Sequence, residues 1–167
     1  DVHRTGPDPV GARPDVGAPP RVTPRLDDPQ LIRARDPSSA PEKGEVMSRV
    51  ESLNRILRSL QSASPDVEAS ALISEDGLMI ASALPAHVDE TRVAGMSATL
   101  SSLGTRAATE LERGELDEVL VRGKDGYAVM LAASSGTLLL ALASKQAKLG
   151  LVFLDMRRAI DDIRKVL

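Results

Sequence analysis

The pattern of apolar and polar positions becomes regular from about residue 46 and predicts a folded region that extends to the C-terminus. Its first element is an amphipathic helix that begins at Ser48, which has capping-box spacing to Glu51, and ends at the pair Ser64 and Pro65. The apolar face of this helix comprises Val50, Leu53, Leu57 and Leu60. Spacings of three and four residues predict that this face packs on a core.

Two strands and a long helix follow. Residues 67–74 and 78–84 are strand-like, and the Gly in the turn at 75–77 supplies the positive φ of a tight hairpin. Asp89 is a good N-cap for the next helix, which should run to about Arg113, with Gly114 placed to end it.

Three more strands are predicted at residues 116–122, 127–133 and 137–144, joined by short Gly-containing turns as a meander. The last two are apolar on both faces, so helices must cover both sides of the sheet centre. The first carries Glu118 and Arg122 and reads as an edge strand. A final amphipathic helix from about residue 149 completes the order helix, two strands, helix, three strands, helix.

The long helix at 89–113 has three stripes at helical spacing. The large apolar stripe is predicted to pack on the sheet: Val93, Met96, Leu100, Leu103, Ala107 and Leu111. A second stripe of small residues would admit a second helix at close range, although a smooth surface without a partner has the same composition: Ala94, Ala98, Ser101, Thr105 and Ala108. A third, polar stripe is a solvent or partner face: Arg92, Thr99, Arg106, Glu110 and Arg113.

The N-terminal segment has a different composition. Nine of the eleven prolines precede Glu45. This stretch has too few apolar side chains to offset the cost of ordering its backbone, so we expect a disordered tail at 1–45 and one domain at 46–167. Within the tail, residues 26–35 can be read as a short docking helix or as a plain linker.

Candidate chemistry is sparse. His3 and His87 are the two histidines, and there is no cysteine, so neither a His pair nor a thiolate site is available for catalysis or zinc. No phosphate-binding loop motif occurs, and the acidic residues at 110–118 straddle a helix end and a strand, which is a poor metal site. We therefore expect no catalytic residue, no cofactor and no metal.

Charge and hydropathy exclude two further classes of function. A net charge of −3 and two aromatic residues, Tyr127 and Phe153, argue against nucleic-acid binding. The apolar runs at 127–133 and 138–143 are far too short for a membrane span, so a cytoplasmic protein is the default expectation.

Two stretches resemble the Roadblock family of dynein light chains and bacterial MglB-like regulators. Residues 71–82, Ala-Leu-Ile-Ser-Glu-Asp-Gly-Leu-Met-Ile-Ala-Ser, look like the first hairpin of that family. The run at 127–151, with its Gly-containing turn, apolar last strand and Leu149-Gly150-Leu151 entry into the final helix, is similar as well. The resemblance covers about residues 47–167.

The resemblance implies an α/β (α+β) three-layer sandwich, with the long helix on one face of a five-stranded antiparallel sheet and the terminal helices on the other. It also implies a homodimer built from the third strand and the long helix, and it implies a Ras-like small GTPase as partner. The expected dimer interface is Ala94, Ala98, Ser101, Thr105, Ala108, Leu116, Val119 and Val121. The expected partner-binding residues are Arg92, Arg106 and Arg113. A small-ligand sensor or a structural subunit without a GTPase is the alternative function.

Overall fold

A computed structural model describes residues 43–167. The predicted tail therefore lies almost entirely outside the described residues, together with the candidate docking helix at 26–35. The elements are α1 (Lys43–Ala63), β1 (Val67–Ser74), β2 (Met79–Ala83), α2 (Glu90–Glu110), β3 (Glu118–Arg122), β4 (Gly126–Ser134), β5 (Thr137–Ser144) and α3 (Leu149–Arg164). Their order is the predicted one.

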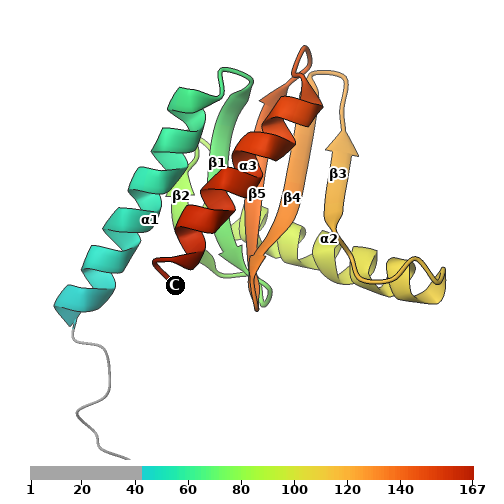
Figure 1. Cartoon of the computed structure of the whole chain (residues 1–167), viewed down its shortest axis with the longest axis horizontal. Coiled ribbons are helices and arrows are strands. Elements are labelled where there is room, and N and C mark those ends of the chain that lie inside the picture. Colours follow the sequence, from blue (N-terminus) through green and yellow to red (C-terminus); the bar gives the residue numbers. More distant parts are fainter. Residues whose placement is uncertain (1–42) are drawn as a thin grey trace, which may run out of the picture. The chain divides into compact units, whose positions relative to one another are not determined.

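The five strands form one antiparallel sheet in the order β2-β1-β5-β4-β3. The predicted hairpin and the predicted meander are both present, and β5 joins them by pairing with β1. Helices α1 and α3 cover one face of the sheet, and α2 crosses the other face (Figure 1). The predicted α/β/α sandwich is thus confirmed.

The two outer strands differ in their surroundings. β2 is five residues long, is packed against both α1 and α2, and meets β1 with an irregular register between Leu72 and Ile73. β3 is also five residues long, but two of its apolar side chains, Leu120 and Val121, are 43% and 42% exposed. The two ends of the sheet are therefore not equivalent.

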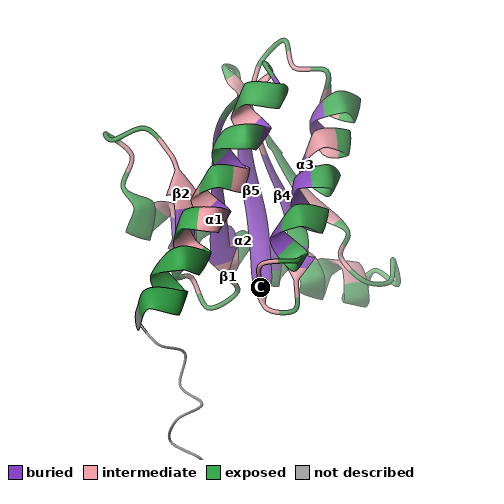
Figure 2. Cartoon of the chain, turned by 60° about the vertical axis from the view of Figure 1, so that its left-hand side comes forward, coloured by how far each residue is buried: buried purple, intermediate pink, exposed green. Residues whose placement is uncertain are grey.

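The larger core lies between the sheet and the helices α1 and α3. Leu57 of α1, Leu139 of β5 and Met156 of α3 are fully buried in it. Figure 2 shows the central strands as the most buried part of the molecule and the outer sides of the helices as exposed. On the other face α2 covers a smaller core of Ala71, Ile73, Ala94, Met130 and Leu140.

The start of α1 differs from the prediction. The helix begins at Lys43, so Ser48 lies inside it, where its carbonyl oxygen accepts a hydrogen bond from Ser52 Oγ at 2.9 Å. The capping box predicted at Ser48 and Glu51 is therefore wrong. In the turn before Ser48, the Glu45 carboxylate lies 2.9 Å from the Arg49 guanidinium. Ion pairs at i,i+4 spacing stabilise a helix, so α1 continues N-terminal to its apolar face.

The N-terminus of α2 agrees with the prediction. Asp89 is extended, and its side chain accepts a hydrogen bond from the backbone N–H of Arg92 at 3.0 Å. This bond satisfies one of the N–H groups that have no partner in the first turn of a helix. The far end closes early, at Glu110, because Glu112 and Gly114 both adopt positive φ.

We expect Asp89→Ala to lower the free energy of unfolding by about 1 kcal/mol, because the N–H of Arg92 loses its acceptor. Urea denaturation followed by circular dichroism measures the change. Asp89→Asn should retain most of the stability, since asparagine also caps helices. Equal losses for Ala and Asn would show that the cap does not act through this hydrogen bond.

Candidate interaction surface

The side of α2 that faces the sheet is the stripe of small residues. The buried residues of α2 are Ala94, Ser97 and Ser101. The large apolar side chains point away from the domain instead, with Met96 52%, Leu103 60% and Leu111 65% exposed. The prediction that the large apolar stripe forms the core is therefore wrong for most of its members.

Close approach of α2 to the sheet explains why small residues face it. A Cβ built on Gly104 would lie 3.2 Å from side-chain atoms of Leu116 and Val119, and one built on Gly77 would lie 3.5 Å from Cα of Gly95. The contact at Gly77 is an ordinary van der Waals distance, whereas a Cβ at Gly104 would require Leu116 and Val119 to shift slightly. The small stripe thus seats α2 on its own sheet.

The residues predicted to form the dimer interface occupy three environments. Ala94 and Ser101, at 0% and 9% exposure, are covered by the chain's own sheet and are not free to meet a second subunit. Half-buried positions are Ala98, Ala108, Leu116 and Val119, and exposed positions are Thr105 and Val121. For Ala94 and Ser101 the structure corrects the prediction, because both belong to the fold.

The surface left without a partner combines α2 and β3. Its apolar members are Met96, Leu100 and Leu103 on α2, Leu111 at the C-cap of that helix, and Val121 on β3. We call these five residues the α2–β3 surface. Figure 1 shows the C-terminal half of α2 continuing past β3, the last strand on that side of the sheet. Sequence reasoning identified the four helical residues as apolar but assigned them to the core.

The three predicted partner-binding arginines are exposed. Arg106 lies 3.9 Å from Glu110, with both side chains 74% exposed, and such a pair contributes little to stability. Arg113 lies beyond the end of α2, where its Nε donates to the carbonyl oxygen of Leu111 at 2.8 Å. Arg92 and Arg106 therefore share the outward side of the helix, while Arg113 is held against the helix end.

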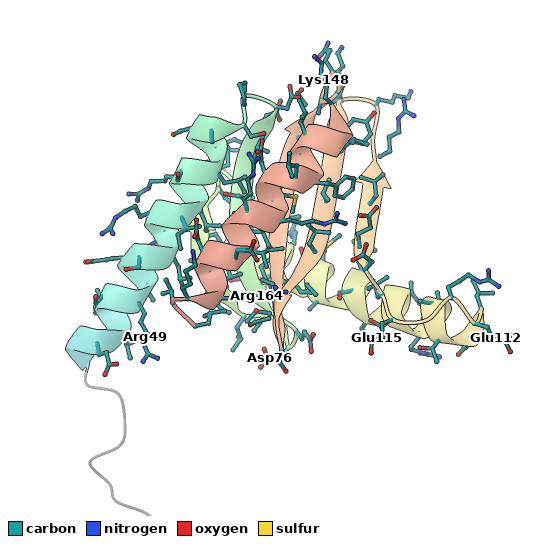
Figure 3. The ribbon with its side chains drawn as sticks, viewed as in Figure 1. Arg49, Asp76, Glu112, Glu115, Lys148 and Arg164 are labelled. Atoms are coloured by element: carbon teal, nitrogen blue, oxygen red, sulfur yellow. The ribbon has the colours of Figure 1, made fainter. Side chains whose placement is uncertain are left out.

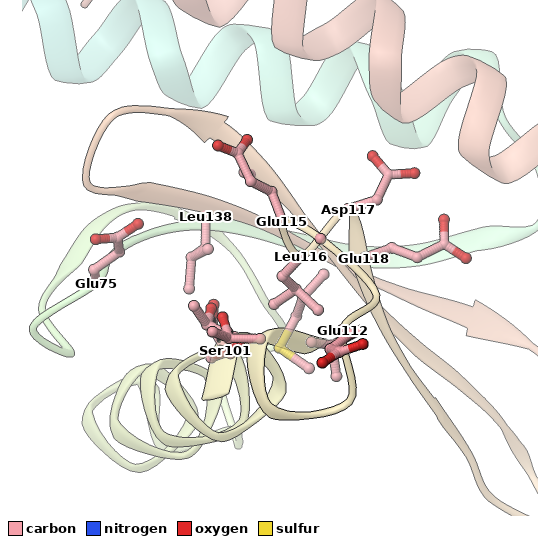
Figure 4. A pocket seen from close by; sticks show the side chains of 14 residues that line it. Glu75, Ser101, Glu112, Glu115, Leu116, Asp117, Glu118 and Leu138 are labelled. Atoms are coloured by element: carbon pink, nitrogen blue, oxygen red, sulfur yellow. Dashed lines mark hydrogen bonds between the residues drawn. The ribbon is translucent and has the colours of Figure 1, made fainter. Parts of the chain in front are cut away.

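A hollow of about 620 Å³ opens between the C-terminal half of α2, the segment after it and the sheet (Figure 4). Leu116, Met130 and Leu138 contribute apolar walls. The acidic side chains around it are Glu75, Glu112, Glu115, Asp117 and Glu118, and no Lys or Arg lines it. Within residues 43–167 no group of acidic residues or histidines is arranged to hold a metal ion. The hollow suits an apolar or cationic group better than an anion.

The labelled charges in Figure 3 are mixed: Asp76 and Arg164 lie at one end of the sheet, and Lys148 lies at the other. β3 itself begins with Glu118 and ends with Arg122. A partner that pairs with β3 therefore meets a negative residue at one end of the strand and a positive residue at the other.

The opposite face of the domain carries mostly local ion pairs. Arg158 lies 3.5 Å from Asp155, and Lys165 lies 2.7 Å from Asp162. The hydrogen bond to Asp162 and its negative charge raise the pKa of Lys165. Exposed apolar side chains on α3 are Leu151 and Leu154.

No helix in the described part of the chain is long and apolar enough to span a bilayer.

Comparison with known proteins agrees with this architecture. A protein of Methanocaldococcus jannaschii with uncharacterized function is 32% identical over 112 residues, which is 67% of this chain and 96% of that protein. The Roadblock/LC7 domain from Streptomyces avermitilis superposes with a TM-score of 0.64 at 23% identity, covering 67% of this chain and 94% of that one. MglB from Myxococcus xanthus superposes with a TM-score of 0.64 at 21% identity, covering 70% and 88%.

The family model described as the Roadblock/LC7 domain matches residues 53–143. The match runs from the first helix into the last strand, so it includes the first stretch that resembles the family in sequence and the part of the second stretch up to residue 143. The chain belongs to the Roadblock/LC7 family.

Proposed function

We propose that this chain is a homodimeric regulator or scaffold that binds a Ras-like small GTPase and modulates its GTP hydrolysis without an active site of its own. The observation that carries the proposal is the α2–β3 surface, which leaves four large apolar side chains of one helix exposed on a Roadblock/LC7 domain. A contiguous exposed apolar patch of this kind marks an interaction site.

A second copy of the chain is the partner that fits the α2–β3 surface. An unpaired strand edge such as that of β3 exposes backbone donors and acceptors and is stable in solution only when it is covered or charged. Pairing of two β3 strands would satisfy these groups, and the exposed α2 side chains would become buried alongside. Leu100 and Leu103 thereby replace Ala94 and Ser101 in the proposed dimer interface, and Val121 remains in it as predicted.

The GTPase would dock on the outward side of the paired α2 helices, where Arg92 and Arg106 project. Neither arginine is positioned by a neighbouring loop, since each extends from a regular helix into solvent. A side chain on such a flat face is poorly placed to enter a nucleotide pocket, so we assign these arginines to docking rather than to catalysis. Regulation would then act through the conformation of the GTPase.

The test mixes the full chain with the small GTPase encoded nearest to it, loaded separately with GTP and GDP. We expect a complex with at least one nucleotide state in size-exclusion chromatography and a changed rate of phosphate release. Arg92→Ala and Arg106→Ala should each weaken binding about 3- to 10-fold, as exposed charges at an interface rim do. Turnover at saturating regulator should change little.

Arg58→Ala is the matched control, because Arg58 is equally exposed but lies on α1, on the opposite face of the sheet. A loss of saturated turnover with intact binding would instead assign a catalytic role to Arg92 or Arg106. The absence of a complex in both nucleotide states, at tens of micromolar of each protein, would contradict the GTPase proposal.

The alternative is a small-ligand sensor, and the hollow beside α2 is the observation that favours it. Its volume of about 620 Å³ is within the range of ligand pockets, and it combines apolar walls with acidic side chains. A sensor of this kind would bind a cationic or amphiphilic molecule. Failure of the GTPase experiment would promote this function.

A further inference from the structure

The outer edge of β3 has a charge pattern that is complementary to itself. β3 reads Glu118-Val119-Leu120-Val121-Arg122, an acid at its start and a base at its end with three apolar residues between. It pairs with β4 on one side, and in the described part of the chain no strand pairs with its other side. An antiparallel copy of the same strand would present its base to this acid and its acid to this base.

Geometry limits how two copies of this strand can pair. In an antiparallel pair, the residue numbers of two opposite residues add up to the same sum all along the strands, and this sum defines the register. When a two-fold axis stands perpendicular to a continuous sheet, opposite residues lie on the same face, so the sum must be even. A sum of 236 places Glu118 opposite Glu118 of the partner subunit, and a sum of 244 places Arg122 opposite Arg122 of the partner subunit. Both registers bring like charges together. Sums of 238 and 242 leave a charged residue opposite Leu120.

The remaining register, with a sum of 240, pairs all five residues of the strand. Glu118 then faces Arg122 of the partner subunit on one side of the sheet, and Leu120 faces its own copy on the axis. On the other side of the sheet Val119 faces Val121 of the partner subunit. Every charged position meets its opposite, and every apolar position meets an apolar one.

The surroundings of the two charged residues agree with this register. The guanidinium of Arg122 lies 5.7 Å from the ring centroid of Tyr127, its neighbour on β4, and this contact keeps it beside the strand. Glu118 is half-buried and has no ion-pair partner among residues 43–167.

We propose that β3 pairs antiparallel with β3 of a second copy about a two-fold axis at Leu120, and that two Glu118–Arg122 pairs across the seam fix this register and select a like partner. The inference rests on the proposed homodimer and adds its register and its specificity. Opposite charges directly across an antiparallel pair attract, and like charges there destabilise it.

The test uses Glu118→Arg and Arg122→Glu in the full chain. Each variant alone places like charges across both ends of the seam, and we expect the dissociation constant of its homodimer to rise about 30-fold. A mixture of the two variants should form a heterodimer in which both pairs are again opposite, with an affinity close to that of the unsubstituted dimer. The double variant Glu118→Arg/Arg122→Glu should regain the homodimer.

Analytical ultracentrifugation measures the dissociation constants, and native mass spectrometry distinguishes the heterodimer from either homodimer. Arg58→Glu, on α1, is the control for charge reversal and should leave the dimer unchanged. Thermal unfolding of each variant checks that the fold is retained.

The outcomes separate this inference from the proposed function. An unsubstituted chain that is monomeric at micromolar concentration would overturn the dimer and the register with it. A dimer that persists in both single variants, or that fails to re-form when they are mixed, would overturn the register alone. A variant that does not fold is replaced by Glu118→Gln or Arg122→Gln, which should weaken the dimer less than charge reversal does.

Discussion

Gly126→Ala is expected to lower the free energy of unfolding by about 3 kcal/mol or more, the largest effect of any single methyl group in this domain. Gly126 begins β4, opposite Ser144 of β5. A Cβ at this position would lie against the backbone carbonyl oxygen of Ala143, far inside van der Waals contact. Because that carbonyl belongs to the central sheet, it cannot move aside without disturbing the pairing of β4 with β5.

Gly123→Ala is the matched control in the same turn. The nearest atom to a Cβ there is the carbonyl oxygen of Gly126 at 3.7 Å, an ordinary contact. Urea denaturation of both variants gives the comparison. If Gly126→Ala were no less stable than Gly123→Ala, the strands β4 and β5 would have to meet differently from the structure described above.

Leu103→Asp is expected to convert the proposed dimer into a monomer, with a dissociation constant raised on the order of 100-fold or more. The side chain is 60% exposed in the single chain, so its replacement leaves the core intact. In a symmetric dimer each substitution occurs twice and would place two carboxylates in an apolar interface. Multi-angle light scattering over a range of concentrations measures the result.

Ser102→Asp is the control for Leu103→Asp. Ser102 is also exposed and adjacent in sequence, but its side chain projects from a different side of α2. It should leave the dimer in place. A dimer that tolerates Leu103→Asp as well as it tolerates Ser102→Asp would exclude the exposed side of α2 from the interface.

Much of the fold could be predicted from local sequence. The bounds of β1 and β5 agree with the predicted ones, because each is a clear apolar run bounded by turn residues. Asp89 was identified as an N-cap because a capping side chain acts within its own first turn. Gly77 and Gly136 have the positive φ that their turns require. Each of these features depends on neighbours in sequence.

The features that were predicted wrongly depend on neighbours in space. Periodicity separates the stripes of α2 but does not say which stripe the sheet covers. The usual rule that large apolar residues face the core fails here, because Gly104 allows the helix to lie close to Leu116 and Val119. The large side chains Leu103 and Leu111 are then left on the outside. A second subunit that covers these side chains would remove their apolar surface from water, as the hydrophobic effect favours.

The candidate site could be predicted only in outline. β3 was recognised as an edge from its charges, and the structure places it there. The exposure of Leu120 and Val121 and the hollow beside Leu116 depend on how far α2 and its following segment stand from the sheet, which sequence does not report.

The difference between the two outer strands determines whether assembly by strand pairing ends or continues. Once two β3 strands pair, the edges that remain are the two copies of β2. Each lies between α1 and α2, unlike β3, and meets β1 with an irregular register that disturbs the row of backbone groups. A third copy therefore has no suitable strand to join. The proposed ten-stranded sheet is a closed particle of two chains rather than the start of a filament.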